Sequence, residues 1–311
     1  MITEKVLGAY AAVGTLSPEE QAGWYRKIAD EWSINCFEIP FIAGVPVAEE
    51  LVQAFAEMSA SLVVTLVAQG ATVGQQNQAY GLSSLDESSR KTAVMDAFAI
   101  LQQCASLADK GIRIRIVMVQ TGQRMGEPIP HAIALYQSLV DLRNLMASVL
   151  PETILAVEPA DNLPLDHPIP FPAAKKSSLS IPDLIQTVGS VNQDSVGGHP
   201  ISFVVNWGRL LINSDEPISM IKEILGSEVP LAGVIMSGAG STPNGFCDSH
   251  NSHLDPDSGF TPDHANACAG VLRDSPQPIF IGSKCSRKKG EAEVSVEEIL
   301  SAQAALLNEC S

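Results

Sequence analysis

The residues best suited to chemistry are charged side chains that end otherwise apolar runs. Glu158 closes the apolar run 154–157, and Glu38 lies in a similar run. A carboxylate in that position can take a proton from a carbon next to a carbonyl, or hold a cation. Lys284, just beyond another apolar run, can stabilise the oxyanion that such a proton transfer creates. We therefore expect Glu158, Glu38 and Lys284 to be catalytic; the alternative for Glu158 is a structural pair with an arginine such as Arg115 or Arg209.

Other polar side chains occupy equivalent positions or lie just beyond them. Their amide, hydroxyl, aromatic and guanidinium groups suit the binding of a hydroxylated molecule, and a tryptophan can supply an apolar platform for the face of a sugar. We expect the following residues to bind substrate: Tyr10, Gln69, Gln120, Asn206, Trp207, Arg209 and Ser237.

A long irregular segment follows the seventh apolar run. We expect a loop over 237–262, and loops of this length are often functional. With Glu158, three of its residues form a candidate metal-ligand set: His250, His253 and Asp255. A solvated, mobile loop is the alternative. Its glycines, together with Lys284, also permit a phosphate site.

The order of elements indicates how these residues are positioned. Eight apolar, β-branched runs alternate with helical patterns, as expected of parallel strands joined by helices. The predicted strands are 6–12, 36–42, 62–67, 112–119, 153–158, 201–206, 231–236 and 278–281. The clearest helix start is Ser17-Pro18 followed by Glu20, a capping box with proline in the first turn. Eight such units predict a single (β/α)8 TIM barrel over 1–311, whose active site lies at the carboxyl ends of the strands.

Composition narrows the class of protein. Of 311 residues, 45% are hydrophobic but only 5% aromatic, which suits strands buried on both faces. The net charge of −16 argues against nucleic acid or an anionic membrane as a partner. The six cysteines form no C-x-x-C pair, and the start lacks the features of a signal peptide. We expect a cytoplasmic protein with a small-molecule substrate; a homo-oligomer remains open.

Two short motifs carry a resemblance to a known group of barrels. Phe37-Glu-Ile-Pro40 ends the second strand and Val157-Glu-Pro159 follows the fifth, an arrangement that resembles the xylose-isomerase-like superfamily of sugar isomerases, ketose epimerases and related endonucleases. The resemblance implies a divalent metal (Mn, Mg, Co or Zn) held by Glu, Asp, His and Glu at the ends of strands five to eight. Glu158 matches the first ligand. Asn206, Ser237 and the exit 282–284 depart from the other three.

Three functions remain open. The leading hypothesis is a sugar or polyol isomerase or epimerase that uses Glu158 as acid and base. The second is a catalytically degenerate barrel that binds a carbohydrate without turnover, which the departures from the ligand pattern favour. The third is a phosphosugar lyase or aldolase that uses Lys284. Amidohydrolase chemistry is disfavoured because the first strand has no H-x-H.

Overall fold

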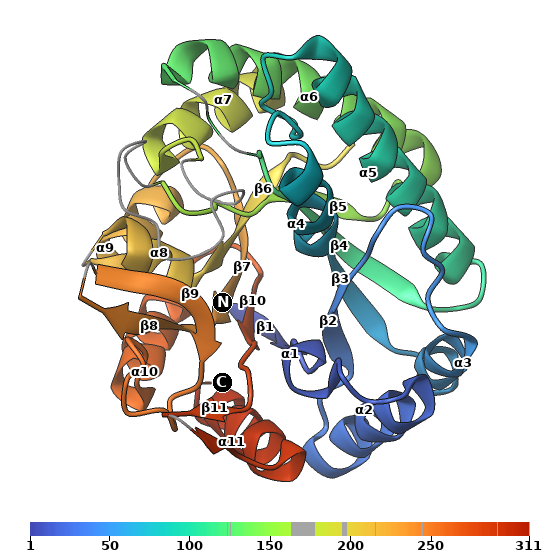
Figure 1. Cartoon of the computed structure of the whole chain (residues 1–311), viewed down its shortest axis with the longest axis vertical. Coiled ribbons are helices and arrows are strands. Elements are labelled where there is room, and N and C mark those ends of the chain that lie inside the picture. Colours follow the sequence, from blue (N-terminus) through green and yellow to red (C-terminus); the bar gives the residue numbers. More distant parts are fainter. Residues whose placement is uncertain are drawn as a thin grey trace.

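The computed structural model is a closed barrel of eight parallel strands, in the order β1-β10-β7-β6-β5-β4-β3-β2 (Figure 1). It describes all residues except 123, 125, 163–177, 195–197, 215, 244, 291 and 311. The barrel strands are β1 (Ile2–Leu7), β2 (Cys36–Pro40), β3 (Ser61–Thr65), β4 (Arg113–Val119), β5 (Ile154–Val157), β6 (Ser202–Asn206), β7 (Leu231–Met236) and β10 (Ile279–Ser283). The predicted fold class is confirmed.

Helices follow the strands. They are α1 (Tyr10–Val13), α2 (Pro18–Trp32), α3 (Glu49–Glu57), α4 (Val67–Gln76), α5 (Glu87–Ala108), α6 (Pro128–Val149), α7 (Ile181–Asp194), α8 (Trp207–Asn213), α9 (Pro217–Leu225), α10 (Pro262–Arg273) and α11 (Val296–Glu309). Most of them form an outer ring, inside which α1 and α4 lie (Figure 1). The capping box at Ser17 and Glu20 is present at the start of α2, as predicted. No helix in the described part of the chain is long and apolar enough to cross a membrane.

The structure differs from the sequence prediction in three places. The first strand is Ile2–Leu7 rather than 6–12, and residues 10–13 form a helical turn instead. After β3 the chain forms α4, a helix that was not predicted from the sequence. Most of the predicted loop over 237–262 is a β-hairpin of β8 (Gly238–Thr242) and β9 (Gly245–Asn251), which packs on α8. Two short strands, β11 (Lys288–Lys289) and β12 (Ala292–Glu293), pair near the C-terminus.

The interior of the barrel determines which polar side chains reach the mouth. A core cluster separate from the larger layer between sheet and helices includes Val6, Cys36, Val63, Met118, Ala156, Val204, Ile235 and Phe280. Side chains alternate between the two faces of a strand, so residues two or four positions further on point to the same side. Those positions hold Glu38, Thr65, Gln120, Glu158, Asn206, Ser237 and Lys284. The barrel therefore changes from apolar to polar toward the carboxyl ends of its strands.

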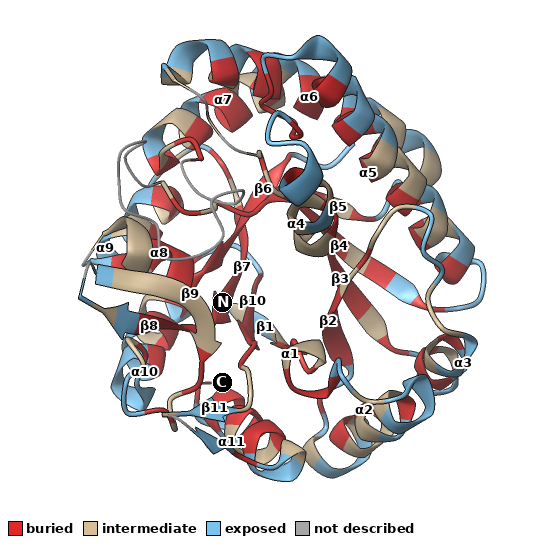
Figure 2. Cartoon of the chain, viewed as in Figure 1, coloured by how far each residue is buried: buried red, intermediate tan, exposed pale blue. Residues whose placement is uncertain are grey.

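The burial of side chains agrees with this arrangement of the barrel. In Figure 2 the strands and the inward faces of the helices are buried, and the outer faces of the ring are exposed. Besides apolar side chains, the buried set includes charged residues from the strand ends, among them Glu38, Glu158, Arg209 and Lys284. Burying a charge is costly unless it is paired, so the partners of these four residues indicate their roles.

Candidate functional site

Lys284 and Glu38 form a buried ion pair at the mouth of the barrel. The Lys284 Nζ lies 2.9 Å from Glu38 Oε1, although the two residues are 246 positions apart in the sequence. Tyr10 donates its hydroxyl to the same oxygen at 3.2 Å, and Nζ also lies 5.8 Å from the centre of the Tyr10 ring. Closure of the barrel between β10 and β1 brings these residues together. The other oxygen of Glu38, Oε2, has no hydrogen-bond partner among the described residues.

This cluster keeps its lysine charged. Burial alone would lower the pKa of Lys284, but the negative charges of Glu38 and Glu158 outweigh it, so that this pKa lies well above its ordinary value. Burial also raises the pKa of Tyr10, which therefore stays a neutral phenol. The centre of the mouth thus contains a fixed ammonium with a phenol donor beside it.

Glu158 lies on the other side of the mouth and has no cationic partner in contact among the described residues. Its side chain is 3% exposed and accepts a hydrogen bond from Gln120 Nε2 at 2.5 Å. The same Gln120 nitrogen donates to the Thr65 hydroxyl at 3.3 Å, and Gln120 Oε1 is buried without a partner in the described chain. The carboxylate of Glu158 is thus oriented by an amide rather than neutralised by a cation.

The arginines proposed as structural partners for Glu158 are engaged elsewhere. Arg115 pairs with Glu4 at 3.4 Å, at the opposite end of the barrel. Arg209 pairs with Asp161 and Asp248, both at 2.7 Å. The alternative of a structural Glu158–arginine pair is therefore wrong. A buried carboxylate without a cation in contact is a rare arrangement and is typical of functional sites.

A cavity at the mouth of the barrel is lined by Glu158 and Gln120. It extends beneath α4 to α5, and Arg209 lines it as well. Figure 1 shows α4 lying inside the outer ring of helices, near the ends of β4 and β5. Most of the wall is apolar or small, including Leu66, Leu82 and Ala97. The cavity therefore connects the carboxylate of Glu158 to an apolar space between α4 and α5, which we call the chamber.

A polar cluster stands at the edge of this chamber. Gln69 accepts from the Ala43 backbone nitrogen at 3.0 Å and donates to Tyr80 at 3.0 Å and to Asp96 at 2.7 Å. Tyr80 also donates to Asp96 at 2.9 Å. The predicted substrate-binding residue Gln69 thus lines the cavity, but its amide is already used to hold the wall.

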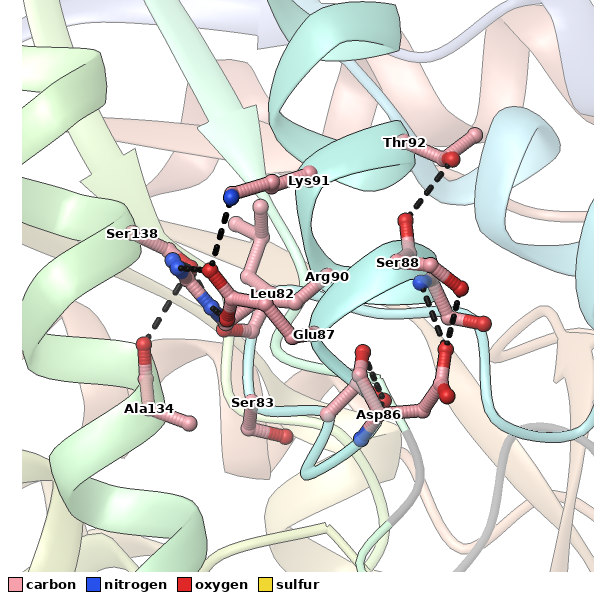
Figure 3. A network of polar contacts seen from close by, with 12 residues as sticks. Leu82, Ser83, Asp86, Glu87, Ser88, Arg90, Lys91, Thr92, Ala134 and Ser138 are labelled. Carbon is pink, nitrogen blue, oxygen red and sulfur yellow. Dashed lines mark hydrogen bonds and ion pairs between the residues drawn. The ribbon is translucent and has the colours of Figure 1, made fainter.

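A second network fixes the outer wall, where the segment 80–86 crosses from α4 to α5. Figure 3 shows Arg90 between Glu87 and Ser138, and the Ser138 hydroxyl bonded to the Leu82 carbonyl at 2.7 Å. Gly81 also touches the loop after β4: a Cβ on Gly81 would lie 2.6 Å from the Cα of Gly122. The chamber is therefore a formed pocket with a pinned wall.

On the β6 and β7 side, the predicted ligand-binding side chains have local partners. Asn206 Oδ1 accepts from the Gly208 backbone nitrogen at 3.0 Å and caps α8. The Ser237 hydroxyl lies 2.8 Å from His250 Nδ1 of the hairpin. Trp207 is buried and stacks on His264 with ring centres 5.2 Å apart, so its indole serves in packing. These side chains hold α8 and the hairpin in place.

The remaining candidate metal ligands do not gather at Glu158. Asp255 Oδ1 accepts a hydrogen bond from the Asp257 backbone nitrogen. Burial lowers the pKa of His253, and the negative charge of Glu309 at the end of α11 opposes this effect in part. No group of three His, Cys, Asp or Glu side chains suited to a metal ion occurs among the residues that the structure describes. The metal role of His250, His253 and Asp255 stays a prediction.

The four positions that hold a metal in the resembling barrels fit such an ion poorly here. Besides Glu158 they present an amide oxygen engaged in a helix cap, a hydroxyl bonded to a histidine, and the ammonium of Lys284. The ammonium of Lys284, at one of these positions, repels a divalent cation. The phosphate hypothesis is weakened too, because the glycines of 238–240 belong to the paired strand β8 and Lys284 is bound to Glu38.

Sequence reasoning missed Thr65, Tyr80, Asp96 and Asp248. Thr65 ends β3 on the inner face, so strand alternation could have found it. Asp248 reaches Arg209 only because β9 folds back on β8. Asn-Gly at 244–245 is the sequence signal for such a turn, and Gly245 has a φ of +107°. Tyr80 and Asp96 carry no local signal.

Comparisons with known proteins identify the fold. The apo structure of 3-keto-D-glucoside 4-epimerase YcjR from E. coli aligns with a TM-score of 0.66 and 13% identity, covering 99% of this chain and 100% of that one. A D-psicose 3-epimerase structure determined with D-fructose gives 0.66 at 10% identity, covering 99% and 98%. An AP endonuclease family 2 protein from Brucella melitensis gives 0.61 at 11% identity, covering 93% and 95%. These likenesses confirm the (β/α)8 barrel fold.

No curated protein sequence matches the chain. Residues 6–298 match the model of one family, described as "Domain of unknown function (DUF4862)". The match takes in seven barrel strands in full, the end of β1, and every residue of the site. The chain therefore belongs to the DUF4862 family.

Proposed function

We propose that this protein transfers a proton at a carbon next to the carbonyl of a sugar or sugar-like polyol, as an isomerase or epimerase. The observation that carries the proposal is Glu158: a buried carboxylate at the end of a cavity, bonded to Gln120 and free of any cation in contact among the described residues. The sugar epimerases that share the fold support this choice of reaction.

The residues around Glu158 suit each part of that reaction. The Glu158 carboxylate takes the proton from the carbon, and the electron pair moves onto the carbonyl oxygen to give an enediolate. The charged Lys284 ammonium, held by Glu38, opposes the new negative charge. Gln120 Oε1 and Glu38 Oε2, which have no partner in the described chain, accept hydrogen bonds from substrate hydroxyls. Return of the proton to the neighbouring carbon, with transfer of the hydroxyl proton to the former carbonyl oxygen, completes an isomerisation. Return of a proton to the opposite face of the same carbon, with the electron pair moving back from the oxygen, completes an epimerisation.

Two other functions are less well supported. A Schiff-base lyase needs a neutral lysine, whereas the charges around Lys284 raise its pKa. A barrel that binds a carbohydrate without turnover is the second candidate, favoured by the engagement of Asn206 and Ser237 in structural hydrogen bonds. The binding function and the isomerase differ in one measurable property, which is exchange of a substrate proton with solvent.

The test is proton exchange in D2O with a panel of ketoses and aldoses, followed by NMR at the carbons beside the carbonyl. We expect exchange, and a loss of about 10²–10⁴-fold in Glu158→Gln, which keeps the shape and the bond to Gln120 but cannot take a proton. Thermal unfolding checks that the variant is folded. Equal exchange in both proteins would remove Glu158 from the mechanism.

Treatment with a chelator tests whether Lys284, rather than a bound metal ion, opposes the charge on the oxyanion. Because Lys284 opposes that charge in our proposal, exchange is expected to persist after treatment with EDTA. Binding of a sugar without any exchange would instead favour the carbohydrate-binding function.

A further inference from the structure

The cavity at Glu158 is more apolar than a bare sugar requires. Its lining includes the polar side chains of Glu158, Gln120, Arg209, Gln69 and Tyr80. Arg209 is paired with two aspartates, and Gln69 and Tyr80 bond to Asp96, which leaves Glu158 and Gln120 to meet a ligand. The rest of the wall comes from side chains such as Leu66, Val67, Leu82, Val119 and Ala97. Small residues at this wall leave the space between α4 and α5 open rather than filled.

The polar groups at the outer end are engaged with one another. Gln69, Tyr80 and Asp96 exchange three hydrogen bonds, and Gln69 also holds the Ala43 backbone. A sugar hydroxyl entering the chamber would lose its hydrogen bonds to water and find few replacements, which is costly. An apolar group entering the same space gains free energy in proportion to the area it buries.

The wall of the chamber is also built to stay in place. Arg90 and Ser138 pin Leu82, as Figure 3 shows, and His131 Nδ1 lies 2.7 Å from the Ser83 carbonyl. Ligand pockets are usually formed before the ligand arrives, and a fixed wall selects by shape. The chamber is therefore a recognition element continuous with the reactive end.

We propose that the substrate is a sugar conjugate, with its sugar ring at Glu158 and an apolar aglycone in the chamber between α4 and α5. An aglycone on the anomeric carbon keeps the ring closed, so the carbonyl needed for proton transfer is a ketone on the ring itself. The reaction that supplies this substrate is then the oxidation of a ring alcohol. The inference rests on the proposed function only in placing the reacting carbon at Glu158.

The test uses n-alkyl glycosides of glucose, galactose and mannose, from methyl to hexyl, which carry the aglycone but no ketone. Binding is measured by calorimetry, so the result does not depend on turnover. We expect the affinity in at least one series to rise about fourfold per added methylene until the chamber is full. Affinity that does not change with chain length, or no binding in any series, would overturn the inference.

Gly70 on α4 offers a way to fill the chamber without disturbing the core. It lines the cavity, and a Cβ built on it meets no atom within 4 Å. Gly70→Phe is expected to abolish the gain with chain length, so that methyl and hexyl glycosides bind with similar affinity. Gly70→Ala, which favours the helix, should retain most of the gain.

Met95→Phe is the matched control on the facing helix. Met95 is 62% exposed, so a phenylalanine there adds the same ring outside the chamber. If Gly70→Phe keeps the full chain-length dependence, or Met95→Phe loses it, the aglycone does not lie in the chamber. A chain-length gain without proton exchange on ketone-bearing sugars would retain the chamber assignment and refute the proposed reaction.

Discussion

Two halves of the barrel mouth treat their polar side chains differently. On the half formed by β10, β2, β4 and β5, which we call the open half, Glu38 and Gln120 each keep a buried oxygen without a partner among the described residues, and Glu158 lines a cavity. On the half formed by β6 and β7, the closed half, Asn206 and Ser237 bond to α8 and to the hairpin. Both halves come from the same inward positions of barrel strands. The difference shows that a strand-end position is not by itself a functional site.

The physical reason lies in the element that comes after each strand. α8 begins directly after β6, so the first side chain beyond the strand becomes a helix cap. After β7 the hairpin folds back and offers His250 to Ser237. After β4 and β5 no element in the described part of the chain covers Gln120 and Glu158 in this way, and α4 leaves a chamber between them and α5. Our proposal therefore assigns the ligand chemistry to the open half, where buried oxygens lack a partner among the described residues.

The largest effect is expected from Lys284→Met in the open half. It removes the cation and leaves Glu38 buried without its ion pair, which costs about 3–5 kcal/mol of unfolding free energy in urea denaturation. The same change should lower proton exchange by at least about 10²-fold, since no charge then opposes the enediolate.

The double variant Lys284→Met with Glu38→Gln separates the two effects. It should recover much of the stability, because the buried charge is gone, but none of the exchange. Full exchange in a stable double variant would show that Lys284 takes no part in the reaction. It would also remove one of the differences between the open half and the closed half.

Alkaline pH should lower the unfolding free energy of the protein through Cys285, the residue next to Lys284 in the open half. Burial raises the pKa of this thiol to about 12, above the 9.0 of a free cysteine. A raised folded-state pKa gives stability that is complete below pH 9 and is lost as the pH rises toward 12. Between pH 8 and pH 11 the thiol should account for about 3 kcal/mol of the loss in unfolding free energy.

Cys285→Ala tests this expectation by removing the titrating group. The fall in urea stability between pH 8 and pH 11 should be smaller in the variant by about that amount. A fall of equal size in both proteins would mean that the thiol ionises as readily in the folded chain as in the unfolded one.

The smallest effect is expected from Asp248→Asn in the closed half. It weakens the hydrogen bond to Arg209 and should cost about 2 kcal/mol, seen as a modest drop in the thermal midpoint. Proton exchange should change by less than about threefold. A loss of exchange comparable to that of Lys284→Met would show that the hairpin takes part in the reaction.

The sequence was sufficient for the barrel because the signals of its elements are local. Apolar β-branched runs predicted the strands, and Ser17 and Pro18 marked a helix start that the structure retains. The helix α4 was missed because Gly70, Gly74 and the β-branched residues among its ten positions lower helix propensity.

The site was only partly predictable, for a different reason. Glu158, Glu38 and Lys284 could be assigned to strand ends, and strand alternation turns all three inward. The Lys284–Glu38 pair depends on barrel closure across 246 positions, and the roles of Asn206 and Ser237 depend on elements that fold over them. Such long-range partners carry no signal in the neighbouring sequence.

The contact between Gly81 and Gly122 also bears on how the family can diverge. The two backbones touch, so a side chain at either position would push apart the segments that carry Leu82 and Gln120. A single replacement would thus alter both the shape of the chamber and the position of Gln120, which is the hydrogen-bond partner of Glu158. Relatives are therefore expected to retain both glycines or to replace both together, and pairwise covariation at these two positions would mark the members that have evolved a differently shaped chamber.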